Sequence, residues 1–281
     1  MSRTSARIGS IAAIVITCAG FWSMARLRWD TQARLSYDSV RYYAGAISIA
    51  ASGRYLDLDG TPQQVWPPRI PLLYAALSRI TGRDPLAFVP LVNGFAYLFT
   101  MAALFLLGRI SGMRWWTVAL VMAAIGWNSH YASMQNKLWS EPVTLALLVV
   151  TLACAAAALR NPERASYLIV AACAAAAAAI TMRYAAVAVV PVLMVVALMA
   201  RRPWLALAPL ATPLPLLLTL SALGASQEKR SIALQAIPWL SNGIASLELA
   251  DQFVPQRFTF AVGGIVAILL WVGAGPPSPF P

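Results

Sequence analysis

Charged residues are scarce in this chain. Asp and Glu number 10 against 21 Lys and Arg, and all four types together make up 11% of the 281 residues. Soluble domains carry about 25% charged residues. Here 60% of the residues are hydrophobic and the mean hydropathy is +0.69. This composition excludes an ordinary soluble domain and predicts an integral membrane protein.

Cysteine and histidine are also scarce. The three cysteines, Cys18, Cys154 and Cys173, all lie inside apolar runs, so we predict neither a disulfide framework nor a thiolate metal site. The single histidine, His130, cannot form a zinc site with them. It follows Trp127 and Asn128 near the end of an apolar run, and we expect an interfacial role for it.

Nucleotide-binding motifs are missing as well. The chain has no Gly-rich nucleotide loop, Walker lysine motif or Rossmann fingerprint, which argues against an ATP-driven pump or a nucleotide-sugar enzyme. The net charge of +11 could suggest nucleic acid. In a membrane chain, however, Lys and Arg first mark loops, so we predict contacts with anionic membrane lipids and no nucleic acid.

Apolar runs long enough for membrane helices recur along the whole chain. They span residues 8–25, 86–108, 115–130, 141–159, 165–181, 184–200, 203–224 and 258–274. The predicted fold is therefore all-α, a polytopic membrane protein of about eight transmembrane helices that form a single domain over residues 1–281. We interpret the first run as a retained signal-anchor helix, since it lacks a clear cleavage site.

Arginine pairs stand at every second junction between these runs. The pairs are Arg3 with Arg7, Arg109 with Arg114, Arg160 with Arg164, and Arg201 with Arg202. The positive-inside bias predicts that these junctions and the N-terminus are cytoplasmic. The expected location is the plasma membrane, with segment 26–85 on the outer face.

Two short helices are predicted within this outer loop. Residues 38–52 carry apolar residues at helical spacing and end before Gly53, a plausible C-cap. Residues 70–80 follow two prolines and end at Thr81 and Gly82. Both segments are too short to span the hydrocarbon core, so we expect interfacial helices that could cover a cavity among the spans.

Four strings carry a resemblance to a known family. They are "YDSVRYY" after the first run, "GRY" with "WPPRIPLLYAAL" before the second, "LWSEPVTLALL" at the start of the fourth, and "ITMRYAA" at a tight outer hairpin. In this order the chain resembles the polytopic GT-C glycosyltransferases, within them the protein mannosyltransferase and aminoarabinose transferase group. The resemblance covers roughly the first 200 residues.

The resemblance implies transfer of a sugar from a polyprenyl-phosphate donor to an acceptor on the outer face. Asp38 inherits the catalytic role, as the base that takes a proton from the acceptor hydroxyl. Arg183, with Lys137 or Arg41, would hold the donor phosphate. Acceptor or accessory roles fall to these residues: Glu141, Tyr42 and His130. No metal site or cofactor is assigned, although the outer-face carboxylates could bind a divalent metal.

Each of these residues also has a structural interpretation. Asp38 could cap a helix. Ser140, Glu141 and Pro142 together form a good helix start. Arg183 could be a snorkelling arginine at the membrane surface. Asp57, with Asp59, has the pattern of a turn residue.

Two other classes of protein remain open. Pro191, Pro213 and Pro215 interrupt the sixth and seventh runs, which keeps a membrane transporter as the alternative function. The chain ends in "GAGPPSPFP" after the eighth run, whereas members of the resembled family carry more spans. This ending predicts a truncated copy of the family, which could be catalytically inactive.

Overall fold

The computed structural model describes residues 3–29, 35–63 and 66–223, and all that follows concerns these ranges. Their regular secondary structure is entirely helical, apart from one isolated β-bridge between Leu56 and Pro62. The chain divides into two compact units, Met1–Ile110 with Arg114–Ala225, and Ser111–Met113 with Ser226–Pro281. Every helix described below belongs to the first unit.

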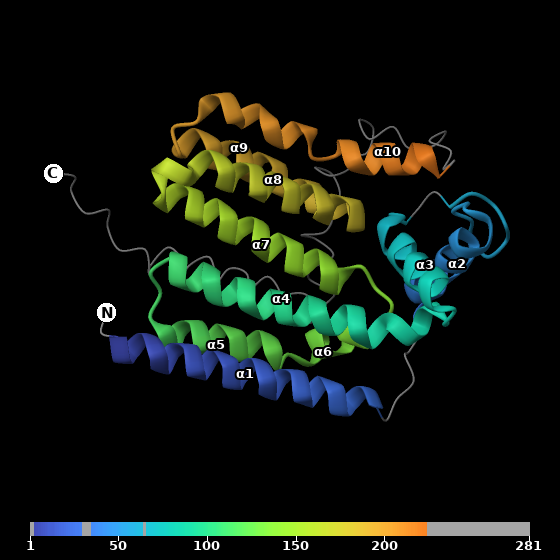
Figure 1. The fold of residues 1–281 in the computed structure, drawn as a ribbon, viewed down its shortest axis with the longest axis horizontal. Helices are drawn as coiled ribbons and strands as arrows, with labels where there is room; N and C mark the ends of the chain where they lie inside the picture. Colours follow the sequence, from blue (N-terminus) through green and yellow to red (C-terminus); the bar gives the residue numbers. More distant parts are fainter. Residues whose placement is uncertain (1–2, 30–34, 64–65, 224–281) are drawn as a thin grey trace, which may run out of the picture. The chain divides into compact units, whose positions relative to one another are not determined.

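Figure 1 shows how the helices are arranged. The α-helices are α1 (Arg3–Trp29), α2 (Tyr37–Ser52), α3 (Arg69–Thr81), α4 (Val89–Ile110), α5 (Trp115–Gly126), α6 (Ser129–Gln135), α7 (Glu141–Arg160), α8 (Ala165–Met182), α9 (Val189–Met199) and α10 (Leu214–Ala222). The 3₁₀ helices are η1 (Pro85–Phe88), η2 (Pro162–Arg164), η3 (Tyr184–Ala188) and η4 (Pro203–Ala211).

Four helical stretches are long and apolar enough to cross a membrane. They are Pro85–Ile110, Glu141–Arg160, Pro162–Met182 and Pro203–Ala222. Three further expected runs form shorter apolar helices, Ile8–Trp22, Trp115–Gly126 and Tyr184–Met199. The eighth expected run, 258–274, lies outside the described residues. Within the described residues the all-α fold is thus confirmed, with four helices long and apolar enough to span a membrane, and the count of eight spans is not.

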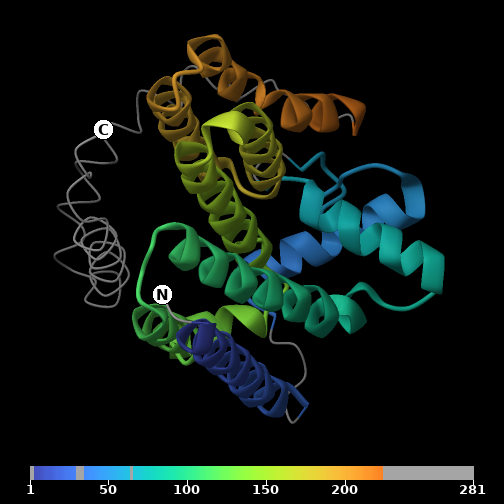
Figure 2. The same cartoon turned by 60° about the vertical axis from the view of Figure 1, so that its left-hand side comes forward.

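Small side chains hold the centre of the bundle together. On α8, Ala172, Ala176 and Ala179 are fully buried at helical spacing. Ala172 and Ala176 pack in one cluster with Ala155 of α7 and with α9. Because alanine adds little bulk beyond the backbone, these helices can approach closely without a driving force from water. Figure 2 shows α7 and α8 side by side.

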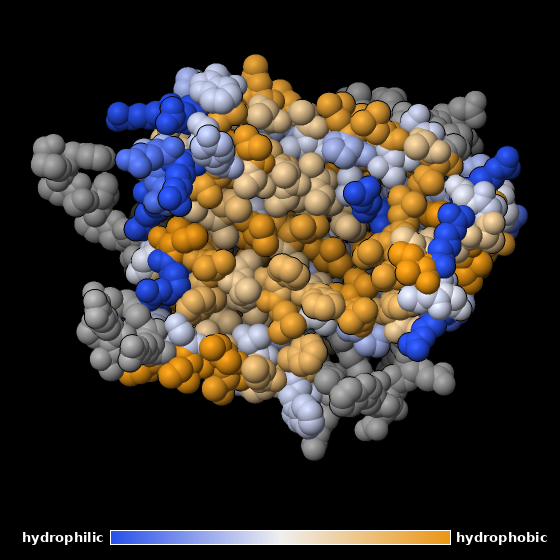
Figure 3. All heavy atoms as spheres, in the orientation of Figure 1, coloured by the Kyte–Doolittle hydropathy of each residue, from blue (hydrophilic) through white to orange (hydrophobic). Residues whose placement is uncertain are grey.

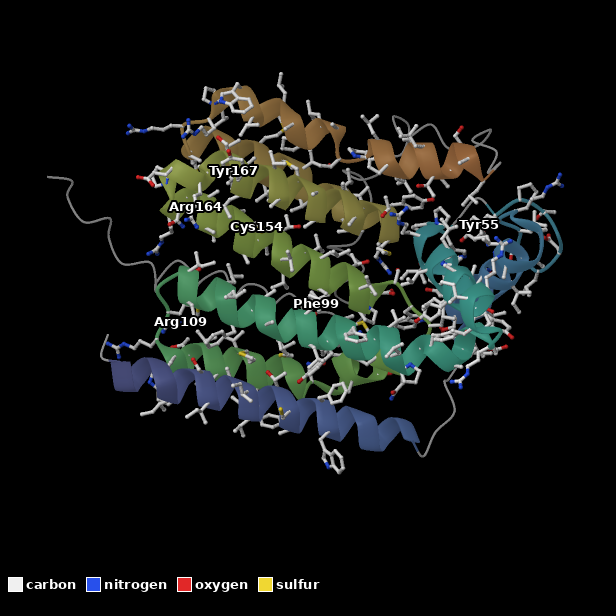
Figure 4. All side chains as sticks on the ribbon, viewed as in Figure 1. Tyr55, Phe99, Arg109, Cys154, Arg164 and Tyr167 are labelled. Carbon is white, nitrogen blue, oxygen red and sulfur yellow. The ribbon has the colours of Figure 1, made fainter. Side chains whose placement is uncertain are left out.

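The arginine-bearing junctions lie at one end of this unit. Figure 4 labels Arg109 and Arg164 at the same end, with Tyr55 at the opposite end. Arg202, after α9, donates from Nη2 to the carbonyl of Pro162 at 3.1 Å, which ties the α9–η4 junction to the α7–α8 junction. On the face drawn in Figure 3, most hydrophilic residues gather at the two ends, and apolar residues lie between them. We call the junctions at residues 109–114, 160–164 and 201–202 the arginine end.

The opposite end carries α2 and α3, both formed where the sequence predicts them. Ser36 caps α2, because its Oγ accepts a hydrogen bond from the backbone N–H of Ser39. Gly53 and Gly82 end the two helices in the left-handed conformation, with φ of 73° and 69°, which only glycine adopts at little steric cost. Helices are therefore present at both places where the sequence predicts them.

One hydrophobic cluster fixes these two helices to the ends of the membrane-spanning ones. It joins α2, α3, η1 and α4 with the loop before α7, through buried Tyr42, Ala46, Ile70, Tyr74, Phe88, Val89 and Leu138. Val143 of α7 and Met182 of α8 pack against it. The polar residues of α2 are thereby placed at the start of α7 and the end of α8.

Two expected runs, 115–130 and 203–224, are not continuous α-helices. Run 115–130 breaks after Gly126, because Asn128 caps a new helix by accepting from the N–H of Tyr131. Run 203–224 is 3₁₀ as far as Ala211, with Pro209 inside it, and α10 begins only after Pro213. Proline cannot donate to the helical ladder, so it interrupts the span.

Candidate functional site

Three elements far apart in the sequence bring polar residues together at the α2–α3 end. These are the first turns of α2, the start of α7 at Glu141, and the residue after α8, Arg183. Arg183 is extended, with φ −152° and ψ 125°, between α8 and η3. The chain therefore reverses there within a few residues, as predicted, and Arg183 reaches back to α7.

Glu141 is the most heavily bonded carboxylate of this group. Its Oε1 accepts a hydrogen bond from Nη1 of Arg183, which makes an ion pair between α7 and the end of α8. Its Oε2 lies 3.4 Å from the hydroxyl of Ser140, and that hydroxyl accepts from Tyr42 Oη at 3.1 Å. We call Tyr42, Ser140, Glu141 and Arg183 the Glu141 network.

Ser140 differs from the helix cap expected from its sequence. Its backbone is helical, and its side chain makes no capping hydrogen bond to α7. It is fully buried, and its hydroxyl connects Tyr42 of α2 to Glu141. A Ser-Glu-Pro string gives no local signal for such a connection, because Tyr42 is 98 residues away.

Asp38 lies beside this network without belonging to it by a hydrogen bond. It is half-buried in the first turn of α2, where Ser36, not Asp38, is the cap. Within the described residues, the Asp38 carboxylate makes no hydrogen bond or ion pair. The capping role considered for Asp38 is therefore wrong, and a carboxylate without a partner here is free to accept a proton or bind a ligand.

The charges of this group converge on the hydroxyl of Tyr42. Burial raises the pKa of Tyr42 to about 12, and the hydrogen bond with Ser140 opposes that rise. The charge of Glu141 raises the pKa further, that of Arg183 lowers it, and that of Asp38 raises it. The Tyr42 hydroxyl thus interacts electrostatically with the carboxylates of Asp38 and Glu141 and with the guanidinium of Arg183, so these four side chains lie near one another. Tyr42 is 2% exposed, so it positions its neighbours and is not itself open to a ligand.

Lys137 lies at the edge of the same region. Its Nζ is 4.2 Å from the centre of the Trp139 ring, and Trp139 donates from Nε1 to Ser36 Oγ at 2.6 Å. The loop that carries both residues is held to α4, since Nδ2 of the buried Asn93 donates to the Lys137 carbonyl at 2.9 Å. Lys137 is therefore fixed beside the N-terminus of α2. Neither the Trp139 link nor the Asn93 anchor was predicted from the sequence.

Arg41 and His130 lie apart from the Glu141 network. Arg41 donates from Nη1 to Asp57 at 2.6 Å and from Nη2 to the hydroxyl of Tyr37. Asp57 is thus an ion-pair partner as well as a turn residue, whereas Asp59 bonds only within its own turn, to Thr61. His130 is exposed on α6, and in the described ranges no hydrogen bond or ion pair joins it to the network.

The described residues contain no group of three or more His, Cys, Asp or Glu side chains that could hold a metal ion. The charged side chains that the structure places in and beside the network are two carboxylates, Asp38 and Glu141, and two cations, Arg183 and Lys137.

Comparison with known proteins adds nothing to the geometry. No protein-family model matches the chain, and no curated protein and no solved structure is significantly similar to it. The resemblance to GT-C glycosyltransferases stays a prediction that depends on the sequence strings.

Proposed function

We propose that the chain is a GT-C-like glycosyltransferase that moves a sugar from a polyprenyl-phosphate donor to an acceptor hydroxyl. The observation that carries this proposal is the carboxylate of Asp38, unpaired among the described residues, beside the Glu141–Arg183 ion pair, at one end of helices long and apolar enough to span a membrane. A base next to a cation, at the depth of a lipid headgroup, suits a lipid-linked phosphate ester.

The reaction needs few groups from the protein. The acceptor oxygen attacks the anomeric carbon of the sugar, and the bond from that carbon to the phosphate oxygen breaks. Asp38 takes the acceptor proton, and the bonding electrons leave with polyprenyl phosphate. The phosphate leaves already ionised, so no general acid is required, and nearby cations stabilise the charge that builds on it.

The other residues take supporting roles. Arg183 is 42% exposed and faces the region as a planar donor that suits a phosphate. Lys137 adds a second positive charge near the N-terminus of α2. Glu141 lies where an acceptor hydroxyl would approach, and Tyr42 orients it through Ser140. Arg41, held by Asp57, is left out of this assignment, as is His130.

The distribution of arginines supports an orientation. If the arginine end faces the cytoplasm, as the positive-inside bias predicts, then α2, α3 and the Glu141 network face outward across the plasma membrane. The shorter apolar helices and run 258–274 would complete an eight-span arrangement.

A membrane transporter is the second candidate, and the interrupted span favours it. The 3₁₀ turn over Pro203–Ala211 and the break at Pro213 resemble the discontinuous helices of transporters. A transporter has no need of a base at Asp38, however.

Sugar transfer from a polyprenyl-phosphate donor, assayed in membranes that carry wild type or Asp38→Asn, separates the candidates. Transfer by wild type that is lost in the variant supports the enzyme. Absence of transfer by wild type, with donor bound, would contradict it.

A further inference from the structure

Arg183, the cation assigned to the donor phosphate, already has an anionic partner. Its Nη1 donates to Glu141 Oε1. Both side chains remain open to solvent, 42% for Arg183 and 22% for Glu141. A phosphate that binds Arg183 must therefore displace the Glu141 carboxylate or share the guanidinium with it. If both anions contact the guanidinium, they repel each other.

The second oxygen of Glu141 is held from the opposite side. Ser140 Oγ lies 3.4 Å from Oε2, and Tyr42 Oη donates to Ser140 at 3.1 Å. Ser140 and Tyr42 are both buried, so this pair of hydroxyls is fixed by the packing of α2 against α7. Loss of Arg183 as a partner would leave Glu141 attached through Oε2.

We propose that Glu141 is an internal competitor of phosphate at Arg183. Without ligand, the Glu141 carboxylate neutralises Arg183. The phosphate of a polyprenyl-phosphate lipid displaces Oε1, while Ser140 and Tyr42 keep Glu141 beside Asp38 for the acceptor. This inference rests on the proposed function for the identity of the phosphate, but not on catalysis itself.

The exchange has a physical reason. The guanidinium of Arg183 offers several N–H donors in one plane, and a phosphate fills them better than the single carboxylate contact seen here. The pair is partly exposed, so its strength is modest, and a better-matched anion can displace the carboxylate.

Binding of a polyprenyl phosphate to purified protein in nanodiscs of zwitterionic lipid tests the exchange, with the uncharged polyprenol as reference. Glu141→Gln removes the competing charge and keeps nearly the same shape. We expect this variant to bind the phosphate lipid about 2- to 10-fold more tightly than wild type. Glu163→Gln makes the same change in an exposed residue of η2, at the arginine end, and should leave the affinity unchanged.

Unchanged or weaker binding by a folded Glu141→Gln protein would overturn the proposal. Glu141→Asp keeps the charge but shortens the side chain, so its affinity should lie between the two. This variant serves as the test if Glu141→Gln does not fold. Wild-type protein that binds polyprenyl phosphate but transfers no sugar would refute the transferase and leave the exchange standing. Equal binding of polyprenyl phosphate and polyprenol by wild type would refute both.

Discussion

Substitution of Asp38 by Asn is the perturbation on which the catalytic assignment most depends. The change keeps the size of the side chain and removes its ability to take a proton. Help from a general base is worth about 100- to 10,000-fold in rate. At 1.36 kcal/mol for each factor of ten, this corresponds to about 3 to 5 kcal/mol of transition-state stabilisation.

The structure separates this loss from an effect on folding. Asp38 is not the cap of α2, and in the described ranges it makes no hydrogen bond or ion pair that Asn would break. Its charge in the first turn interacts favourably with the helix dipole, which is worth about 0.3 to 1 kcal/mol. We therefore expect normal expression and donor binding, together with a loss of at least about 100-fold in sugar transfer.

The assay is sugar transfer in membranes with matched amounts of each variant. Asp59→Asn is the control, because Asp59 is exposed and bonds only to Thr61 of its own turn. Asp57 is unsuitable, because its neutralisation would break the ion pair with Arg41. Transfer by Asp38→Asn within a few-fold of wild type would refute the assignment and move the search for a base to Glu141.

Three further predictions address the phosphate, the network and the orientation. Arg183→Ala should weaken donor binding by about 1 to 3 kcal/mol, and Arg183→Lys should restore only part of it, since a point charge replaces the planar donor; equal binding by all three proteins would exclude the phosphate role. Burial raises the pKa of Tyr42 to about 12, so the neutral phenol contributes to the stability of the folded protein up to about pH 10. This contribution, at most about 2 to 3 kcal/mol, is lost between about pH 10 and 12. In thermal melts, the stability of Tyr42→Phe should therefore fall less steeply than that of wild type as the pH rises through this range. Part of the pH dependence should remain, because burial also raises the pKa of Tyr55. In a cysteine-free background, Leu58→Cys should react with impermeant reagents in intact cells and Glu163→Cys should not; the reverse result would invert the orientation.

The sequence predicted the parts of the fold that local chemistry determines. The helices α2 and α3 end where glycines supply a left-handed residue, at Gly53 and Gly82. The tight turn at Arg183 follows in the same way from a short-range pattern. The apolar runs gave the right regions for helices but the wrong continuity, because hydropathy does not register a side-chain cap such as Asn128.

The candidate site was predictable in its members and not in its contacts. Asp38, Glu141 and Arg183 were each singled out, but nothing local indicates that Arg183 bonds a residue 42 positions away. Ser140 was expected to cap α7, but its side chain bonds to Tyr42 instead. The same Ser-Glu-Pro string is compatible with a helix cap and with a tertiary hydrogen bond. Only the packing of α2 against α7, which buries Tyr42, decides between these roles.

The division of labour between the two carboxylates follows from this packing. Glu141 has partners on both oxygens. Arg183 partly neutralises its charge, and the buried hydroxyls of Ser140 and Tyr42 fix its position. Asp38 is half-buried and lacks such partners in the described part of the chain. A base must offer a lone pair to the acceptor proton, whereas a residue that orients an acceptor must hold its place. For the sugar transfer that we propose, Asp38 is therefore the better base, and Glu141 is better suited to orient the acceptor hydroxyl.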